Sequence, residues 1–232
     1  MRKIAFSAVQ RISALDLSCA ARMAAVGTRQ AKLDAIAKVE TAASSVLAEF
    51  SDYSVAPGTT VIMKGTAKGV FVGSHPQSTF DAFNLIGLER HRRLAELGSG
   101  TGLVGRIASL FVPEVILVEE DRELMAVSRM LDKRVARFIP EVGHIAHIRG
   151  DYTRMNNLYR TSDVFFNFVD GDSQKLAKKH FARLSRPGSI FILKSAKEIE
   201  KGGIGQGVQD ITASIPHFDR FTKAEWFVYR KA

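Results

Sequence analysis

The sequence predicts an α/β protein with a doubly wound, Rossmann-like sheet, preceded by a helical extension and a short β-hairpin. Short apolar runs alternate with amphipathic segments from about residue 78 onward. This alternation is typical of a mostly parallel sheet with helices on both faces. A glycine-rich turn follows the first run, and the 232 residues are enough for one sizeable domain plus an extension.

The composition is that of a globular protein, with 46% hydrophobic and 25% charged residues. No run of 18 apolar residues occurs, so we expect no membrane partner. The single cysteine, Cys19, fits a reducing compartment, and we expect a cytoplasmic protein. Organelle import is the alternative, because the first thirty residues are basic and rich in Ala and Ser. The net charge of +9 leaves a nucleic-acid partner open.

Residues 1–56 are predicted to form the helical extension, and residues 57–232 the main domain with its leading hairpin. Over residues 1–50 alanine is dense, proline is absent and apolar residues recur at helical spacing. Gly27 marks a break between two helices. Between Pro57 and Gly73, strand-forming residues are separated by glycines, which predicts the hairpin.

Apolar runs in the main domain predict its strands, and the segments between them predict its helices. The predicted strands are Leu94–Leu97, Val115–Val118, His144–Ile148, Val164–Phe168, Ser189–Leu193 and Trp226–Tyr229. The predicted helices run from the glycine turn to Phe111, from Arg122 to Phe138 and from Lys175 to Leu184. Pro187-Gly188 predicts a turn.

The strongest local motif is the turn after the first predicted main-domain strand, Glu-Leu-Gly-Ser-Gly-Thr-Gly over residues 96–102. It lies at the carboxyl end of a strand, where open α/β sheets bind ligands. Alternate glycines let the backbone approach a ligand closely. The helix that follows offers free N–H groups to an anion such as a carboxylate.

Two ligands fit this turn. Gly100-x-Gly102-x-x-Gly105 satisfies the dinucleotide fingerprint. Glu96, however, precedes the turn, where a carboxylate repels a pyrophosphate and attracts a cationic amino group. The glycine spacing also resembles the nucleotide-binding turn of class I methyltransferases, and we predict S-adenosyl-L-methionine as the cofactor. The residues predicted to bind it here are Glu96, Gly98, Ser99, Gly100, Thr101 and Gly102.

Two further acidic residues fit the same cofactor. Glu119 directly follows the strand Val115–Val118, where a carboxylate accepts hydrogen bonds from ribose hydroxyls. Asp151 follows the next strand, where it can accept a hydrogen bond from the adenine amine, with Tyr152 against the ring. The alternatives are solvated acids at a helix start for Glu119 and an ordinary turn for Asp151. The order of turn, ribose acid and adenine acid along the chain favours cofactor binding.

Residues 164–196 resemble the non-SET protein-lysine methyltransferases of the disruptor-of-telomeric-silencing kind, including their archaeal and mitochondrial relatives. In that family a strand ends in Asn-Phe, a Leu-Lys-rich helix with a Phe follows, and a glycine turn precedes a strand that ends near Ser-Lys. The matching elements are Asn167-Phe168, Leu176 to Phe181, Gly188 and Lys194-Ser195. Residues 77–81 resemble the family's cofactor-covering loop, which adds Thr79 to the predicted cofactor site.

The resemblance covers about residues 74–200 and implies an enzyme that N-methylates lysine side chains of a protein substrate. Asn167 and Phe168 are the catalytic candidates. Asn167 would align the amine through its side-chain oxygen, while Phe80, Phe166 and Phe168 would wall an apolar channel that lowers the lysine pKa. In the histone-modifying branch two Asn precede the Phe; here a single Asn follows Phe166.

Other functions on the same fold stay open. The chain is alternatively an RNA or small-molecule methyltransferase, or a cofactor-binding module without activity. The oligomeric state is also open. His144 and His147 lie three residues apart on a predicted strand, so their side chains point to opposite faces and we expect no metal site.

Overall fold

The computed structural model describes residues 28–47, 49, 54–55, 62–66, 69–138, 143–168, 172–195, 204–212, 218–219 and 224–232. Its strands are β1 (Ser54–Val55), β2 (Ile62–Thr66), β3 (Gly69–Val72), β4 (Arg93–Leu97), β5 (Glu114–Glu119), β6 (His144–Arg149), β7 (Val164–Asn167), β8 (Ile190–Ser195), β9 (Val208–Asp210), β10 (Phe218–Asp219) and β11 (Ala224–Lys231). Its helices are α3 (Arg29–Leu47), α4 (Pro76–Leu85), α5 (Leu103–Ala108), α6 (Arg122–Phe138), α7 (Asn156–Thr161) and α8 (Asp172–Leu184), with 3-10 turns η2 (Leu88–Arg90) and η3 (Tyr152–Arg154).

The large sheet confirms the predicted doubly wound α/β fold. Its strand order is β10-β11-β8-β7-β4-β5-β6, and β9 also pairs with β11. Strands β4 to β8 pair in parallel, whereas β11 runs antiparallel to β8. The order reverses at β4, which has β5 on one side and β7 on the other. The carboxyl ends of β4 and β7 therefore form the switch point at which such sheets bind ligands.

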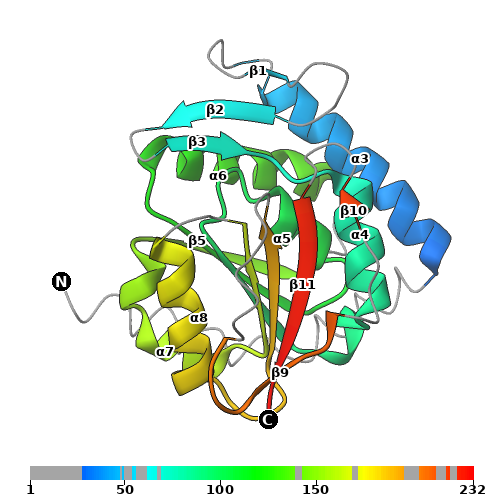
Figure 1. The fold of residues 1–232 in the computed structure, drawn as a ribbon. Helices are drawn as coiled ribbons and strands as arrows, with labels where there is room; N and C mark the ends of the chain where they lie inside the picture. The colour runs from blue at the N-terminus through cyan, green and yellow to red at the C-terminus, as the bar shows by residue number, and fades with distance from the viewer. Residues whose placement is uncertain are drawn as a thin grey trace.

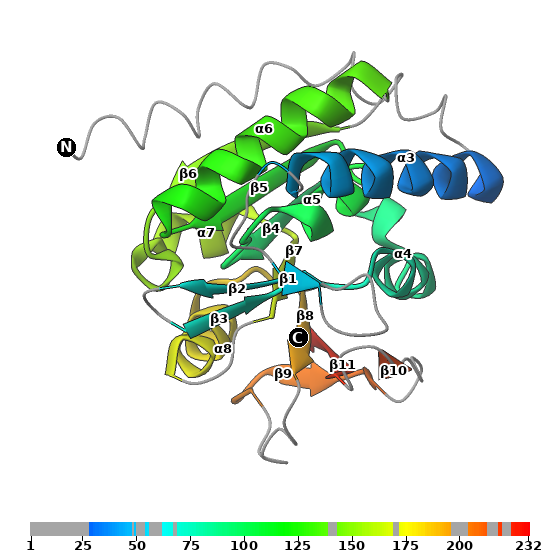
Figure 2. The same ribbon diagram turned by 90° about the horizontal axis from the view of Figure 1, so that it is seen from above.

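Helices cover both faces of this sheet, as Figures 1 and 2 show. Because strand side chains alternate between faces, β4 sends Leu94 to one core and Ala95 to the other. The first core joins the sheet to α3, α4, α5 and α6. The second joins it to η3, α7 and α8. No helix within the described ranges is both long and apolar enough to cross a membrane.

Helix α3 is packed onto the main domain, and it lies along α6 in Figure 2. Its Ile36 and Val39 are almost completely buried in the first core. Near its end, Glu49 accepts a hydrogen bond from Arg134 of α6 at 2.7 Å. The predicted helical character of the extension is thus confirmed over residues 29–47. Cys19, Gly27 and the basic first residues lie outside the described residues.

The predicted hairpin is present as the antiparallel pair β2 and β3. Strand β1 adds a third strand through its pairing with β2, after the residues 1–50 that carry the helical pattern. Backbone pairing with the free edge of β2 explains why Ser54 and Val55 are extended. Lys64 of β2 is buried and forms an ion pair with Glu123 of α6, which ties the small sheet to the main domain.

Two helices differ from the predicted elements. Residues 77–81, expected to form a loop, lie inside α4. Pro76 at the start of α4 suits a first helical turn, and the His75 ring accepts a hydrogen bond from the Ser78 N–H at 3.4 Å. The helix after the glycine turn ends at Ala108 instead of Phe111, because residues 109–111 form a turn.

Candidate functional site

The glycine-rich turn leaves the end of β4 and folds against the neighbouring strand β5. The N–H groups of Gly98 and Ser99 both donate to Val118 O, at 3.0 and 2.9 Å. The Gly102 N–H donates to Ser99 O at 2.7 Å and closes the turn. The φ angles of Gly98, Gly100 and Gly102 are 72°, 54° and 70°. Residues with side chains rarely adopt this left-handed conformation, which explains the three alternate glycines.

Glu119 at the tip of β5 holds the centre of the turn. Its Oε2 accepts a hydrogen bond from the Gly100 N–H at 2.7 Å, and its Oε1 accepts the N–H groups of Glu120 and Asp121, both at 2.8 Å. Burial raises the pKa of Glu119, and these three hydrogen bonds oppose that rise. A carboxylate has about four acceptor positions, so Glu119 retains one for a ligand hydroxyl.

Glu96 lies inside β4, beneath the turn, with only 3% of the residue exposed. Its Oε2 accepts the Gly105 N–H at 2.8 Å, one of the donors that the start of α5 leaves without a helical partner. Burial raises the pKa of Glu96 to about 8, despite the Gly105 N–H and the nearby Arg106 guanidinium. Glu96 therefore supports the turn from within, and its contact with a cationic amino group stays a prediction.

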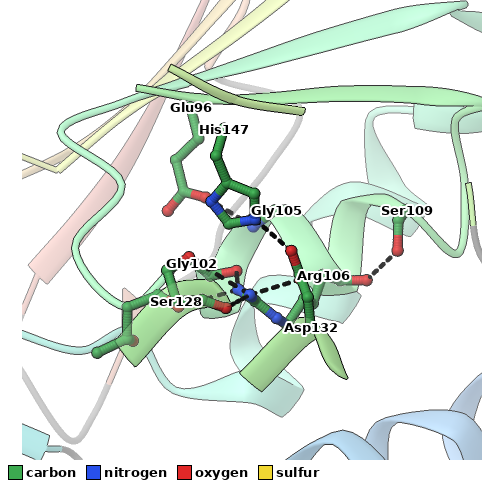
Figure 3. Close-up of polar contacts among 9 residues, drawn as sticks. Glu96, Gly102, Gly105, Arg106, Ser109, Ser128, Asp132 and His147 are labelled. Atoms are coloured by element: carbon green, nitrogen blue, oxygen red, sulfur yellow. Dashed lines mark hydrogen bonds and ion pairs between the residues drawn. The ribbon is translucent and has the colours of Figure 1, made fainter. Parts of the chain in front are cut away.

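Arg106 of α5 is a site residue that is not predicted from the sequence. It is fully buried, and its Nη1 donates to Thr101 O at 2.9 Å and to Gly102 O at 2.5 Å. Its Nη2 donates to Ser128 O and lies 2.5 Å from Asp132 Oδ1 (Figure 3). The available sequence clue is one arginine inside the otherwise apolar segment Leu-Val-Gly-Arg-Ile-Ala.

Asp132 of α6 connects this arginine to strand β6. Its Oδ2 contacts His147 Nε2, so the His147 ring points toward α6, as Figure 3 shows. His144, by contrast, is exposed, which agrees with the prediction that the two histidines point to opposite faces. Among the residues that the structure describes, no cluster of three potential metal ligands occurs.

Asn167 ends β7, directly beside the end of β4. It is fully buried, and its Nδ2 donates to Leu97 O at 2.8 Å. Its Oδ1 has no hydrogen-bond partner among the described residues. A buried acceptor without a partner costs about 1–3 kcal/mol. Such an atom at the switch point is available to a ligand that carries a hydrogen-bond donor.

Tyr152 and Asp151 come from the end of β6. The buried Tyr152 hydroxyl lies near Asn167 and Ser173; burial raises the pKa of Tyr152 to about 12, and these two neighbours oppose the rise. Asp151 caps η3, and its Oδ1 accepts hydrogen bonds from the Thr153 N–H at 2.9 Å and the Thr153 hydroxyl at 2.5 Å. The structure brings Tyr152 toward Asn167, whereas the adenine contact of Asp151 stays a prediction.

The prediction of an aromatic channel is wrong for two of its three phenylalanines, Phe80 and Phe166. Phe80 is fully buried against Phe111 of the first core, with ring centroids 5.4 Å apart. Phe166 packs against Phe83 and Trp226, with centroids 6.2 and 5.6 Å away. The physical reason is strand alternation and the helical state of α4, which direct both rings into the core.

Phe168 is the one remaining candidate of that channel. It follows β7 and is half-buried at the edge of the first core. The Nζ of the buried Lys194, near the end of β8, lies 4.6 Å from the centroid of the Phe168 ring. Phe168 therefore lies at the carboxyl edge of the sheet, one residue from Asn167, as its predicted role requires.

Thr79 is fully buried on α4, and its hydroxyl donates to His75 O at 2.9 Å. A hydrogen bond of this kind occupies the hydroxyl within its own helix. The structure thus bonds Glu119 and Asn167 directly to the glycine-turn segment, and Glu96 to Gly105 in the helix that follows it. It gives Thr79 no such bond to the turn, and the cofactor role of Thr79 stays a prediction.

No family model matches this chain, and no curated protein matches its sequence. Solved structures do match its fold. The CcbJ methyltransferase from Streptomyces caelestis is 18% identical with a TM-score of 0.52, over 69% of this chain and 91% of that one. A putative methylase, HI0767 from Haemophilus influenzae, is 13% identical with a TM-score of 0.50, over 66% and 87%.

A mutant form of MtNAS in complex with S-adenosylmethionine is 15% identical with a TM-score of 0.51, over 68% of this chain and 63% of that one. At such low identity these matches establish the fold alone. The chain has the Rossmann-like α/β fold of these solved structures.

Proposed function

We propose that this chain is an S-adenosyl-L-methionine-dependent methyltransferase. The observation that carries the proposal is the glycine turn at the switch point, with Glu119 Oε2 bonded to the Gly100 N–H at 2.7 Å. In this arrangement the backbone N–H groups of the turn lie beside a carboxylate at the tip of the next strand. Such a pair suits a ligand with a carboxylate at one end and a ribose beside it.

The described residues fit that cofactor by their chemistry. Two buried side-chain oxygens near the carboxyl edge have no hydrogen-bond partner among the described residues: Ser99 Oγ and Asn167 Oδ1. A polar ligand would satisfy such atoms and remove the cost of leaving them unpaired. Glu119 would hold the ribose, and Asp151 and Tyr152 the adenine. Together with a fold shared by solved methyltransferases, this donor and acceptor set supports the cofactor assignment.

The chain's own residues have a limited task in methyl transfer. When bound, S-adenosyl-L-methionine supplies a methyl group on a sulfonium, which is already a good leaving group. The protein then contributes mainly position and exclusion of water. Asn167 is rigidly placed for this, because its Nδ2 is fixed to Leu97 O at 2.8 Å while its Oδ1 stays available to an incoming donor.

We further propose that the methyl acceptor is a lysine amine of a protein. A lysine attacks only as the neutral amine, and its unperturbed pKa is about 10.4. An apolar approach disfavours the charged ammonium and lowers that pKa. Phe168, the next residue in the chain, supplies an aromatic ring at the same edge of the sheet, and Asn167 Oδ1 would accept a hydrogen bond from the amine and orient its lone pair. The family resemblance over residues 164–196 supports the same acceptor.

Calorimetric titration of the purified chain with S-adenosylmethionine, and separately with NAD, tests the cofactor. We expect binding of the first only. Gly100→Arg should abolish it, because a side chain at a φ of 54° obstructs the turn. Gly188→Arg is the matched control, since Gly188 also has a positive φ of 82° and open space around it. Binding of NAD alone would replace the proposal with a dinucleotide protein.

The acceptor is tested with radiolabelled cofactor and three acceptor pools: denatured and native cell protein, total RNA, and a small-molecule extract. Label that enters protein and elutes as methyl-lysine after acid hydrolysis is the expected result. Label in RNA or in small molecules would overturn the lysine assignment and leave the cofactor assignment intact. Cofactor binding without label in any pool would point to a module without activity.

A further inference from the structure

The buried cluster around Arg106 extends the site beyond the residues that would touch the cofactor (Figure 3). Arg106 is completely buried, and its guanidinium has Asp132 as its ion-pair partner at 2.5 Å. Burying an arginine is costly unless charges and hydrogen bonds compensate for the loss of water. An apolar side chain would pack against this face of α5 without the cost of removing a charge from water. The buried guanidinium therefore indicates a role beyond packing.

The hydrogen bonds of Arg106 fall on the ligand-facing turn. Its Nη1 donates to Thr101 O and Gly102 O, and its backbone N–H donates to Gly102 O at 3.2 Å. These are the two carbonyls that end the turn. Because peptide C=O and N–H groups point in opposite directions, fixing both carbonyls inward also fixes the direction of the following N–H groups.

A second set of contacts fixes Arg106 from the other side. Its Nη2 donates to Ser128 O, and the carboxylate of Asp132, one turn further along α6, pairs with the Arg106 guanidinium and contacts His147 Nε2. The guanidinium thus spans α5 and α6, and Asp132 continues the connection to β6. Only a planar, forked cation reaches two carbonyls with one nitrogen and a helix carbonyl with the next.

We propose that Arg106 is a positioning residue that sets the shape of the glycine turn, and hence the affinity for S-adenosylmethionine, with Asp132 holding it in place. The inference rests on the proposed function. Arg106 acts through Thr101 and Gly102, without contact to the cofactor itself. Glu96 adds to the same arrangement, because it accepts the Gly105 N–H one residue before Arg106.

The experiment measures the Kd of S-adenosylhomocysteine and of S-adenosylmethionine by calorimetry for the full chain and its variants. We expect Arg106→Met to raise both Kd values at least about tenfold, and Arg106→Lys to recover part of the loss, because an ammonium reaches one carbonyl but lacks the fork. Thermal unfolding of each variant is recorded alongside.

Arg93 provides a matched control. It is nearly buried, pairs with Glu114 and donates to Thr161 O at 3.2 Å, but it lies at the amino end of β4, away from the turn. Arg93→Met should lower the unfolding temperature as Arg106→Met does, since its ion pair is also largely buried. It should leave both Kd values within about threefold. A purely structural role for Arg106 predicts the same behaviour for both variants.

If Arg106→Met does not fold, Asp132→Asn tests the proposal in its place. This variant removes the charge of the ion pair and keeps an acceptor oxygen. We expect its Kd values to rise by about threefold or more. Unchanged Kd values in Asp132→Asn, or in a folded Arg106→Met, would overturn the inference while the proposed function stands. Failure of the unaltered chain to bind either ligand would overturn the proposed function, and the inference with it.

Discussion

A Cβ atom added to Gly102 would lie 2.5 Å from Arg106 Nη1, closer than Cβ atoms approach other heavy atoms in proteins. Leu117 Cδ1 and Ser128 Oγ would each be 2.6 Å away. The turn therefore rests directly on the buried arginine, without space between them. Position 102 requires glycine for two reasons. A Cβ atom has no space there, and the φ of Gly102 is positive, at 70°.

We expect Gly102→Ala to lower the free energy of unfolding by about 2–5 kcal/mol, the sum of left-handed strain and overpacking. Gly188→Ala is the control, because Gly188 has a φ of 82° but no atom within 4 Å of the added Cβ. It should cost only about 1 kcal/mol. Urea unfolding of both variants measures the difference. Equal losses would show that the space around Gly102 relaxes freely.

Glu119→Ala is expected to raise the Kd of S-adenosylhomocysteine by at least about tenfold, equivalent to about 1.4 kcal/mol. The variant removes the proposed ribose acceptor and also frees the Gly100 N–H from its 2.7 Å hydrogen bond. Calorimetric titration gives the Kd directly. The adjacent, exposed Glu120 is the control, and Glu120→Ala should bind like the unaltered chain. Similar losses in both variants would contradict a specific role for Glu119.

The buried Glu96 makes stability depend on pH. Its folded-state pKa of about 8 lies above the ordinary glutamate value of 4.5. Between these values the folded protein binds more protons than the unfolded chain, so the free energy of unfolding falls as the pH rises. The slope contributed by one such group reaches about 1.4 kcal/mol per pH unit.

Glu96→Gln should remove this fall between about pH 5 and about pH 8, because the amide oxygen still accepts the Gly105 N–H and has no proton to lose. Urea unfolding at both pH values provides the measurement. Glu120→Gln, at an exposed position, should retain the fall. If Glu96→Gln keeps the full pH dependence, another group is responsible for it.

Asn167→Ala should reduce kcat for the lysine acceptor by about 100-fold, the usual effect of removing one aligned hydrogen-bonding group at a reacting centre. The Kd of S-adenosylhomocysteine should change much less, because the turn keeps its contacts to Glu119 and Val118. Single-turnover assays with labelled cofactor measure the first quantity and calorimetry the second. Asn157→Ala, at an exposed position of α7, is the control. Unchanged turnover would exclude Asn167 from the chemistry.

The sequence is most informative where function depends on residues close together in the chain. The turn over residues 96–102 and Glu119 are predicted correctly as neighbours, because strand order and parallel pairing place strand ends side by side. Asn167 lies beside the end of β4 for the same reason, since β7 pairs with β4, and its catalytic role stays a prediction. The predicted strands that surround the switch point are confirmed, with boundaries that differ by a few residues.

Interactions between distant elements are the part that sequence patterns do not predict. Arg106, Asp132 and His147 belong to α5, α6 and β6, and no local pattern links them. The aromatic prediction fails for Phe80 and Phe166 because a phenylalanine suits a core and a channel equally well. Only the direction of the side chain decides between these roles, and this direction depends on tertiary packing.

The docking of α3 against α5 and α6 has a consequence for synthesis of the chain. The helix emerges from the ribosome long before its partners, because the hairpin, α4 and two central strands are translated in between. Until α6 is complete, the apolar stripe that contains Ile36, Val39 and Val46 lacks the helix that makes most of its contacts. Nascent-chain folding therefore leaves this stripe open to chaperones, and truncations ending before α6 should aggregate.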